Sequence, residues 1–305
     1  MSELYTTANW NALGSSCTLV IYEPNQSTNH NLADLAETVT AITEEFEHRF
    51  SRFLSTSELT GFNTHAPGRF QVSDELYQLL ATAKQMHQRT AGFFDPTVIS
   101  YLKRYGYVKA NTHWPLTVDT PKHVPLSPPF SKLVLEDKQS VIKPPGLEVD
   151  LGGIAKTFLL RQIRETVLHG VTNYYLSLGG DVITKGVDGK HAGWLVEIDP
   201  VSAQPKTQLE TVISGLGSIC TSGIVRRKGV TGHQAWHHII DPSTHASLHT
   251  PVLAATAQGD DPVWTEQVAR LALKEYEIID STWLHDHDCQ KLWLQFATTV
   301  THLTV

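Results

Sequence analysis

The segment VDLGGIAKTFLLRQIRETVL (residues 149–168), with NYYLSLGGDV (residues 173–182) after it, contains most of the information about the fold. Val149 and Asp150 are expected to end a strand, and the glycine pair after them to form a turn. Residues 154–168 have the apolar periodicity of a helix. The second segment predicts a strand that ends at another glycine pair. Strand, turn, helix and strand in succession predict a mixed architecture of helices and strands.

The flanking sequence extends this pattern in both directions. A strand is expected over residues 17–22, and a second helix after Ser73, which is a good N-cap. The three- and four-residue spacing of apolar side chains predicts one long helix before it, through Leu32, Leu35, Val39, Ile42, Phe46, Phe50 and Phe53. Residues 132–143 predict a hairpin. Short strands are expected near WLVEID, LETVIS, HHII, LAATA and KLWLQF, with a helix from Pro262.

Helices and short strands mixed in this way predict an α+β fold with mixed or largely antiparallel sheets and packed helices. The chain has no GxGxxG segment and no evenly spaced βαβ units, which disfavours a Rossmann fold.

Composition excludes several classes of protein. A hydrophobic fraction of 41% and a charged fraction of 18% are typical of an ordinary globular chain of 305 residues. The net charge of -7 disfavours sequence-independent binding to nucleic acid, which needs clustered Lys and Arg. No apolar run approaches the roughly 20 residues of a membrane span. We therefore expect neither a nucleic-acid partner nor a membrane span.

Three cysteines, Cys17, Cys220 and Cys289, are too few and too scattered for a disulfide framework or a thiolate metal site. The first residues have no basic region and no apolar region of a signal peptide. Cys17 opens the apolar run CTLVIY and is expected in a strand rather than at a lipidation site. The sequence predicts a cytoplasmic protein, with a processed exported form as the alternative.

Two glycine motifs could bind an anion. In DLGGIAK (residues 150–156) a carboxylate, a glycine pair and a helix start could cradle a phosphate, with Lys156 as a nearby cation. SLGGDV (residues 177–182) has a similar pattern. The alternative in both cases is a turn that needs glycine for its geometry, and this alternative is favoured for the second motif.

DDPVWT (residues 260–265) suggests a metal site. Asp261 suits the N-cap and Pro262 the first position of a helix. Asp261 and Thr265 are one turn apart, so a carboxylate and a hydroxyl could offer hard oxygen ligands to Mg²⁺. The alternative is an ordinary N-cap and a threonine bonded to its own helix.

Three further motifs are weaker when taken alone. HHIIDP (residues 237–242) places histidine, a possible proton acceptor, at the start of a short strand. FFDPTV (residues 93–98) could give aromatic rings to a planar ligand, although aromatic residues at such a turn are usually core. HDHDC (residues 285–289) lacks a recognisable zinc spacing and is expected to be a polar loop.

Taken in order, these motifs resemble those of one family. FSRFLSTSELTGFN, GFFDPTV, VDLGGIAKTF, LSLGGDV, ICTSG, HHIIDP and DDPVWT are similar to the successive motifs of the ApbE family, the flavin transferases once described as thiamine-biosynthesis lipoproteins. The resemblance extends from about Leu13 to Leu273. It implies an ApbE-like fold in one domain over residues 1–305, with two interlocked α/β subdomains and an FAD site between them as the alternative.

The resemblance also implies a reaction and its residues. A Thr or Ser hydroxyl of an acceptor protein with a flavinylation-type motif attacks the FMN phosphorus of FAD, and AMP leaves. Mg²⁺, or alternatively Mn²⁺, bridges the pyrophosphate. His238 is the implied proton acceptor, and the implied metal ligands are Asp261, Thr265 and the backbone carbonyl of Gly153. The implied FAD contacts are Leu13, Phe53, Phe93, Phe94, Asp95, Asp150 and Lys156.

The chain departs from the family pattern at several positions. Thr157 stands where a Gly follows the lysine, Ile224 and Val225 follow TSG in place of a Tyr, His245 replaces a Gly, and Pro262 replaces a small residue. The changes at His245 and after TSG concern the acceptor side more than FAD binding, and Pro262 suits the start of a helix. Two other functions stay open at this point: an FAD pyrophosphatase, in which water replaces the acceptor, and a non-catalytic flavin-binding protein.

Overall fold

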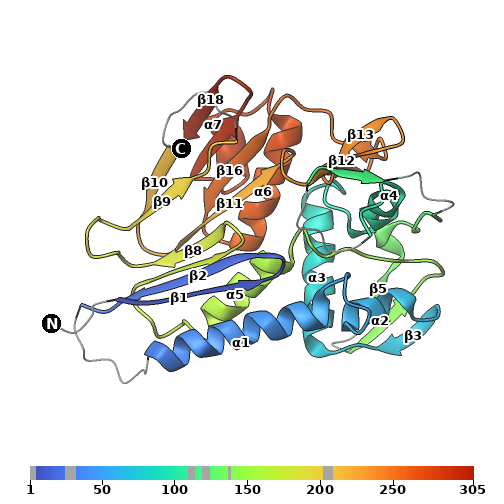
Figure 1. The fold of residues 1–305 in the computed structure, drawn as a ribbon, viewed down its shortest axis with the longest axis horizontal. Coiled ribbons are helices and arrows are strands. Elements are labelled where there is room, and N and C mark those ends of the chain that lie inside the picture. Colours follow the sequence, from blue (N-terminus) through green and yellow to red (C-terminus); the bar gives the residue numbers. More distant parts are fainter. Residues whose placement is uncertain (1–4, 25–31, 109–113, 119–123, 137–138, 202–208) are drawn as a thin grey trace. The chain divides into compact units, whose positions relative to one another are not determined.

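The computed structural model describes residues 5–24, 32–108, 114–118, 124–136, 139–201 and 209–305 (Figure 1). The chain divides into two compact units. Unit 1 consists of Met1–Glu45, Lys156–Gly223 and Thr250–Val305, and unit 2 of Phe46–Ala155 and Ile224–His249. The chain passes from unit 1 to unit 2 within helix α1 (Leu32–Phe50) and back again at the start of helix α5 (Ala155–Thr166).

Unit 1 is built on an eight-stranded sheet. In spatial order its strands are β1 (Tyr5–Ala12), β2 (Ser15–Tyr22), β7 (Tyr174–Leu178), β8 (Asp181–Lys185), β11 (Gly217–Gly223), β16 (Ala254–Gly259), β17 (Lys291–Gln295) and β18 (Val300–Thr304). Every neighbouring pair in this sheet is antiparallel. This confirms the predicted α+β class with a largely antiparallel sheet, and Cys17 lies in a strand as predicted.

Two hairpins of this sheet close through two-residue turns with positive φ at both positions. Leu13 (φ 56) and Gly14 (φ 65) join β1 to β2, and Gly179 (φ 67) and Gly180 (φ 95) join β7 to β8. Such turns match the twist of antiparallel strands. The two glycine pairs of the sequence therefore have different places, because residues 152–153 precede a helix and residues 179–180 close a hairpin.

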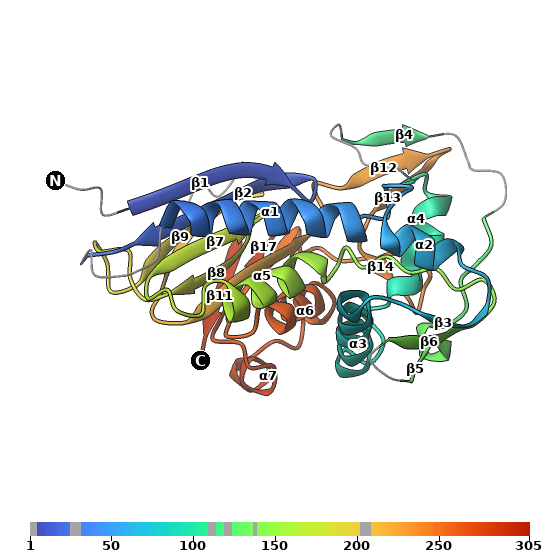
Figure 2. The same ribbon diagram turned by 90° about the horizontal axis from the view of Figure 1, so that it is seen from below.

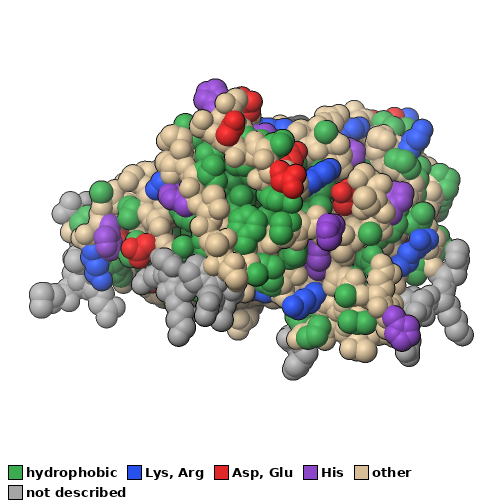
Figure 3. Space-filling model, turned by 90° about the horizontal axis from the view of Figure 1, so that it is seen from above, with side chains coloured by type: hydrophobic (Ala, Val, Ile, Leu, Met, Phe, Trp, Pro, Cys, Tyr) green, Lys and Arg blue, Asp and Glu red, His purple; other side chains and the backbone are tan. Residues whose placement is uncertain are grey.

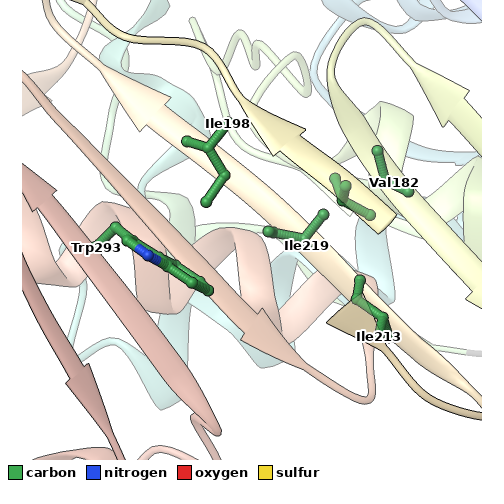
Figure 4. Packing of buried hydrophobic residues seen from close by; sticks show 6 residues of the cluster. Val182, Ile198, Ile213, Ile219 and Trp293 are labelled. Atoms are coloured by element: carbon green, nitrogen blue, oxygen red, sulfur yellow. The ribbon is translucent and has the colours of Figure 1, made fainter. Parts of the chain in front are cut away.

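The central strands of the sheet present different side chains to its two faces. Ile219 of β11 points into an apolar cluster under the hairpin of β9 (Trp194–Ile198) and β10 (Leu209–Ile213), as Figure 4 shows. This cluster consists of Val182, Val196, Ile198, Ile213, Ile219 and Trp293. Since side chains alternate along a strand, Ser218 and Cys220 point to the opposite face.

That opposite face is covered by helix α6 (Pro262–Glu275), which packs on β8, β11 and β16. Helix α5 lies on the same side (Figure 2). Helix α7 (Ser281–Asp286), capped by Asp280, precedes β17. His285 and Asp286 thus belong to a helix, and the polar loop predicted for residues 285–289 begins after it.

Unit 2 combines short helices with three small sheets. Its helices are α2 (Glu58–Thr64), α3 (Asp74–Arg89), α4 (Ile99–Arg104) and the 3₁₀ helices η1 (Pro96–Val98) and η2 (Phe130–Lys132). Its sheets have the strand orders β3 (Gly68–Gln71), β6 (Ser140–Lys143), β5 (Val134–Leu135); β13 (Gln234–His237), β12 (Lys228–Thr231), β4 (Leu116–Val118); and β14 (Ile240–Asp241), β15 (Ala246–Ser247). The pair β4–β12 is parallel.

Short sequence patterns predicted two elements of unit 2 correctly. The Ser73 hydroxyl accepts a hydrogen bond from the Leu76 N–H, which confirms the predicted N-cap of α3. The hairpin predicted over residues 132–143 is the pair β5–β6, although residues 137 and 138 of its turn lie outside the described residues.

One strand prediction in this unit is wrong, and a second is confirmed only in part. Val149 and Asp150 lie in no sheet, and the Asn63 side chain takes the place of a neighbouring strand. It donates to the Val149 carbonyl at 2.9 Å and accepts from the Val149 N–H at 2.8 Å. The segment HHII is divided: β13 ends at His237 and β14 begins at Ile240, so His238 lies between two strands.

The surface gives two further observations. On the face drawn in Figure 3, Lys and Arg side chains are interspersed with Asp and Glu rather than gathered into one block. In the described ranges, no helix combines the length and the apolar character that crossing a bilayer requires.

The apolar core of unit 2 depends on Trp236. Its ring stacks on Tyr105 with centroids 5.5 Å apart, and its Nε1 donates to Thr231 Oγ1 at 3.0 Å. We expect Trp236→Ala to lower the free energy of unfolding by roughly 3–5 kcal/mol, because it leaves a large cavity and removes an internal hydrogen bond. Urea unfolding followed by circular dichroism measures this. Val230→Ala, at an exposed side chain of the same sheet, is the matched control and should change stability little.

The neighbouring His237 makes stability depend on pH. Its Nε2–H donates to the Leu248 carbonyl at 2.9 Å, and its Nδ1 is buried with no hydrogen-bond partner among the described residues. Protonation would bury a new N–H without an acceptor. Burial accordingly lowers the pKa of His237 below 6.5, and the bond to Leu248 opposes this only in part.

The sign of the pH effect follows from this pKa. In the unfolded chain His237 takes up a proton near pH 6.5, whereas in the folded protein it takes one up only at lower pH. The contribution of His237 to the free energy of unfolding is therefore fully present above pH 6.5 and is lost as the pH falls below it. We expect the melting temperature of the wild type to fall more between pH 7.5 and 5.5 than that of His237→Gln. His233→Gln, an exposed histidine in the β12–β13 turn, should keep the wild-type dependence. Equal slopes for all three proteins would contradict this assignment.

Candidate functional site

The N-terminus of α6 places Asp261 and Thr265 one turn apart, in unit 1. The Asp261 side chain caps the helix by accepting from the Val263 N–H at 3.1 Å, and Pro262 occupies the first turn. Thr265 Oγ1 donates to the Asp261 carbonyl at 2.8 Å. The sequence left open that Asp261 is an ordinary N-cap and that Thr265 bonds to its own helix. Both of these bonds are present. The question is whether the same oxygens can also bind a cation.

The donor atoms fit a hard divalent cation. The Asp261 side chain is 40% exposed, and its second oxygen makes only a long contact, 3.4 Å, with Arg161 Nη1. Thr265 Oγ1 gives its one proton to a neighbour, and an oxygen lone pair stays available for a metal. Among the described residues no group of three His, Cys, Asp or Glu side chains is placed to hold a metal. The metal ligands, including Gly153 in the turn before α5, stay a prediction.

Two residues that the sequence analysis did not single out determine the position of Thr265. The Ser218 hydroxyl lies 2.9 Å from Thr265 Oγ1 and also donates to the Gly259 carbonyl at 2.9 Å. A Cβ on Gly259 would lie 2.8 Å from Thr265 Oγ1, so only glycine lets the helix come this close to β16. The signal in the sequence was weak: one serine before ICTSG and one glycine before DDPVWT.

Lys156 lies next to a group of buried polar side chains in unit 1. Its Nζ is 3.1 Å from Asp181 Oδ2. Thr157 Oγ1 donates to Glu266 Oε2 at 2.6 Å. Burial, together with the negative charge of Asp181, raises the pKa of Glu266 to about 7. Thr157, which replaces the glycine of the family pattern, therefore supplies a hydrogen bond to a buried carboxyl group.

Cys220 and Cys289 are poor candidates for a nucleophile. Cys220 is fully buried below α6, and its Sγ contacts the Pro262 carbonyl at 3.5 Å. Burial raises the pKa of this thiol well above its ordinary value, as it raises the pKa of Cys289 to about 12. A thiol that stays protonated is a poor nucleophile and a poor metal ligand.

In unit 2, Asp150 is held by Arg52, another residue that the sequence analysis did not select. Arg52 Nε is 2.8 Å from Asp150 Oδ2, and the arginine side chain is only 5% exposed. The guanidinium lies over the rings of Phe53 and Tyr107, 4.1 and 4.7 Å from their centroids. The other Asp150 oxygen accepts from the Gly152 N–H at 2.8 Å. The signal for Arg52 in the sequence was weak: it is a single basic residue in the segment FSRF (residues 50–53), which has a phenylalanine at each end.

The segment FFDPTV is more buried than a ring platform requires. Phe93 and Phe94 are 5% and 2% exposed. Asp95 Oδ1 caps η1 by accepting from the Thr97 N–H at 2.8 Å and the Thr97 hydroxyl at 2.6 Å. These contacts explain the local turn, and they leave the expected role in FAD binding a prediction.

A neighbouring backbone carbonyl indicates which ring nitrogen of His238, the expected proton acceptor, carries a proton. Its Nδ1 lies 3.3 Å from the Arg227 carbonyl, which can only accept a hydrogen bond. Nδ1 therefore carries the proton of the neutral ring, and Nε2 has the basic lone pair. The side chain is half-buried.

The structure thus divides the expected residues between the two units. Leu13, Lys156, Asp261 and Thr265 belong to unit 1; Phe53, Phe93, Phe94, Asp95, Asp150, Gly153 and His238 belong to unit 2. Leu13 is in the β1–β2 turn with φ 56, a conformation that is costly for a branched residue.

The departure at His245 also has a structural reason. His245 has φ 61, in the left-handed region that the glycine of the family pattern would enter freely. Its ring stacks on Tyr101 with centroids 5.0 Å apart and an interplanar angle of 11°. The histidine therefore keeps the backbone turn and adds an aromatic contact.

Comparison with known proteins identifies relatives along most of the chain. The model of the ApbE family matches residues 13–271. The chain is 26% identical over 218 residues to the FAD:protein FMN transferase of Vibrio cholerae, covering 70% of this chain and 65% of that protein. It is 25% identical over 284 residues to one of Klebsiella pneumoniae, covering 88% and 85%. The chain thus spans just under two thirds of the Vibrio cholerae relative.

Solved structures of the same family share the fold. The ApbE protein of Thermotoga maritima gives a TM-score of 0.78 with 23% identity, over 97% of this chain and 96% of the other. The flavin transferase ApbE of Vibrio cholerae gives 0.76 with 20% identity, over 98% and 96%. Family motifs in order, a match to the family model over more than half of the chain and a shared fold lead to one conclusion: the chain belongs to the ApbE family.

Proposed function

We propose that this protein transfers FMN from FAD to a Thr or Ser hydroxyl of an acceptor protein and releases AMP. Membership of the ApbE family supports this reaction, and relatives in two organisms are named FAD:protein FMN transferases. The observation that carries the proposal is the oxygen pair at the start of α6, Asp261 and Thr265, whose spacing and chemistry suit a cation that binds a pyrophosphate.

The proposed step is a displacement at phosphorus. The acceptor hydroxyl oxygen bonds to the FMN phosphorus, and the bond from that phosphorus to the bridging oxygen breaks, so that the bridging oxygen leaves with AMP. The neutral His238 accepts the hydroxyl proton at Nε2. Lys156 contacts the phosphates as a cation, while Asp150, held by Arg52, and the ring of Phe53 contact FAD.

A divalent cation, Mg²⁺ or Mn²⁺, would be held by Asp261 and Thr265, and would neutralise charge on the pyrophosphate. The chain's own residues prepare this role. The Ser218 hydroxyl lies 2.9 Å from Thr265 Oγ1, and the N-cap bond occupies one oxygen of Asp261, whose side chain is 40% exposed.

One experiment tests the whole proposal. FAD, Mg²⁺ and an acceptor with a flavinylation-type Thr motif are incubated with the protein, and AMP and the intact mass of the acceptor are measured. We expect AMP together with an acceptor that has gained FMN. AMP without a modified acceptor would indicate an FAD pyrophosphatase, and binding of FAD without AMP would indicate a flavin-binding protein.

Asp261→Asn should lower the rate of AMP release about 100-fold or more at a Mg²⁺ concentration of about 1 mM, because a charged metal ligand is lost. Asp260→Asn is the matched control. Asp260 is the residue next to Asp261, and its exposed carboxylate accepts a hydrogen bond from Gln290 Nε2 at 2.8 Å. Quenched-flow or chromatographic assay of AMP measures both variants. Similar losses in the two variants would contradict a metal role for Asp261.

His238→Gln should reduce transfer about 100-fold or more, in the range usual for the loss of a general base, while leaving FAD affinity nearly unchanged. The remaining activity should rise with pH, because a larger fraction of acceptor hydroxyl loses its proton without help. FAD affinity from fluorescence and transfer rates at several pH values separate these effects. A large loss of FAD affinity would instead assign His238 to binding.

A further inference from the structure

The motif SLGGDV has no role in the proposed reaction, yet it lies against Lys156. Asp181 is the first residue of β8, directly after the Gly179–Gly180 turn, and Lys156 is the second residue of α5. Lys156 Nζ is 3.1 Å from Asp181 Oδ2, with the two side chains 16% and 5% exposed. A pair this well shielded from water is screened far less than a surface ion pair.

The turn before Asp181 also contacts the lysine. A Cβ added to Gly179 would lie 3.5 Å from Lys156 Cδ and 2.8 Å from Ser15 Cβ. The methylene chain of Lys156 therefore lies beside Gly179, and a side chain at that position would be in ordinary contact with the lysine but would clash with Ser15. Glycine is needed there twice, for φ 67 and for the space. One motif thus contacts both the stem and the charge of Lys156.

The other charges around the pair make this placement specific. Asp181 Oδ1 lies 3.4 Å from the Thr221 N–H, which orients the carboxylate from β11. Glu266 from α6 is close enough to feel the charges of both Asp181 and Lys156. Arg270, one turn further along α6, is 3.7 Å from Glu266. Lys156 is therefore the cation that Asp181 contacts directly, while Glu266 has Arg270 and Thr157 as its own partners.

We infer that Asp181 is a positioning residue for Lys156. It holds the ammonium group in place before FAD arrives, so that binding does not have to order a flexible four-carbon side chain. Without the carboxylate, the partly buried ammonium loses the oxygen that lies 3.1 Å from it and is less restrained from turning toward water. This inference rests on the proposed function, because it takes Lys156 to contact the phosphates of FAD.

A double-mutant cycle on FAD affinity tests it. Asp181→Asn should weaken FAD binding about tenfold, the order expected when a lysine must be ordered during binding rather than before it. Lys156→Met should weaken binding more, and Asp181→Asn added to Lys156→Met should cost nothing further. FAD fluorescence titration with the full chain measures all four proteins. Asp188→Asn, which removes a carboxylate bonded to His191 in another loop of unit 1, is the control for net charge.

Three outcomes would overturn the inference: unchanged FAD affinity in Asp181→Asn, tighter binding, or an equal loss with and without Lys156. Tighter binding would mean that the carboxylate acts only by repelling phosphate. If the wild type binds no FAD at all, the proposed function fails, and it does so separately from any effect of the variants.

A second readout needs no FAD. Thermal unfolding first establishes that Asp181→Asn is folded. Amine labelling followed by mass spectrometry then measures how fast Lys156 reacts in the free protein. We expect faster labelling of Lys156 in Asp181→Asn than in the wild type and in Asp188→Asn, because the pair that holds the ammonium group is broken. An unchanged labelling rate would show that Asp181 does not position it.

Discussion

Helix α6 can lie close to strand β16 because residue 259 has no side chain. A Cβ on Gly259 would approach Thr265 Oγ1 to 2.8 Å and the Asp288 carbonyl to 3.2 Å. The contact brings the first turn of α6 over the polar side chains of β11, where Ser218 reaches Thr265. The N-cap at Asp261 and the buried Glu266 follow from the same placement of the helix. The polar half of unit 1 therefore depends on one close approach of helix to sheet.

Close packing within each unit removes charged groups from water, and each of these groups needs a partner. In unit 1, Lys156 is paired with Asp181, and Glu266 accepts from Thr157. In unit 2, the buried Arg52 is paired with Asp150. An unpaired charge in such a place would cost several kcal/mol, whereas a pair with good geometry costs little. Two of the residues expected to contact FAD, Asp150 and Lys156, are thus each held by a partner of opposite charge.

Local interactions made much of the fold readable from the chain alone. Ser73, Asp261 with Pro262, and the apolar stripe of α1 act over one or two helical turns, so their patterns predicted the right helices. Failures occurred where a distant group replaced a local partner. The segment at Val149 looks like a strand, but the partner of its backbone is the side chain of Asn63. No pattern within a few residues of Val149 contains that information.

The order of motifs along the chain was enough to indicate the family and the α+β class, because caps, glycine turns and residue periodicity are short-range properties that a sequence carries by itself. Which charged and polar groups meet was decided by tertiary structure alone. Thr157 and Glu266 are 109 residues apart, and Arg161 and Asp261 are 100 apart. Their contacts depend on how α5, α6 and the sheet pack, and packing depends on the shape of all the side chains together. For this reason Ser218, Arg52 and Asp181 acquire their roles only in the folded protein.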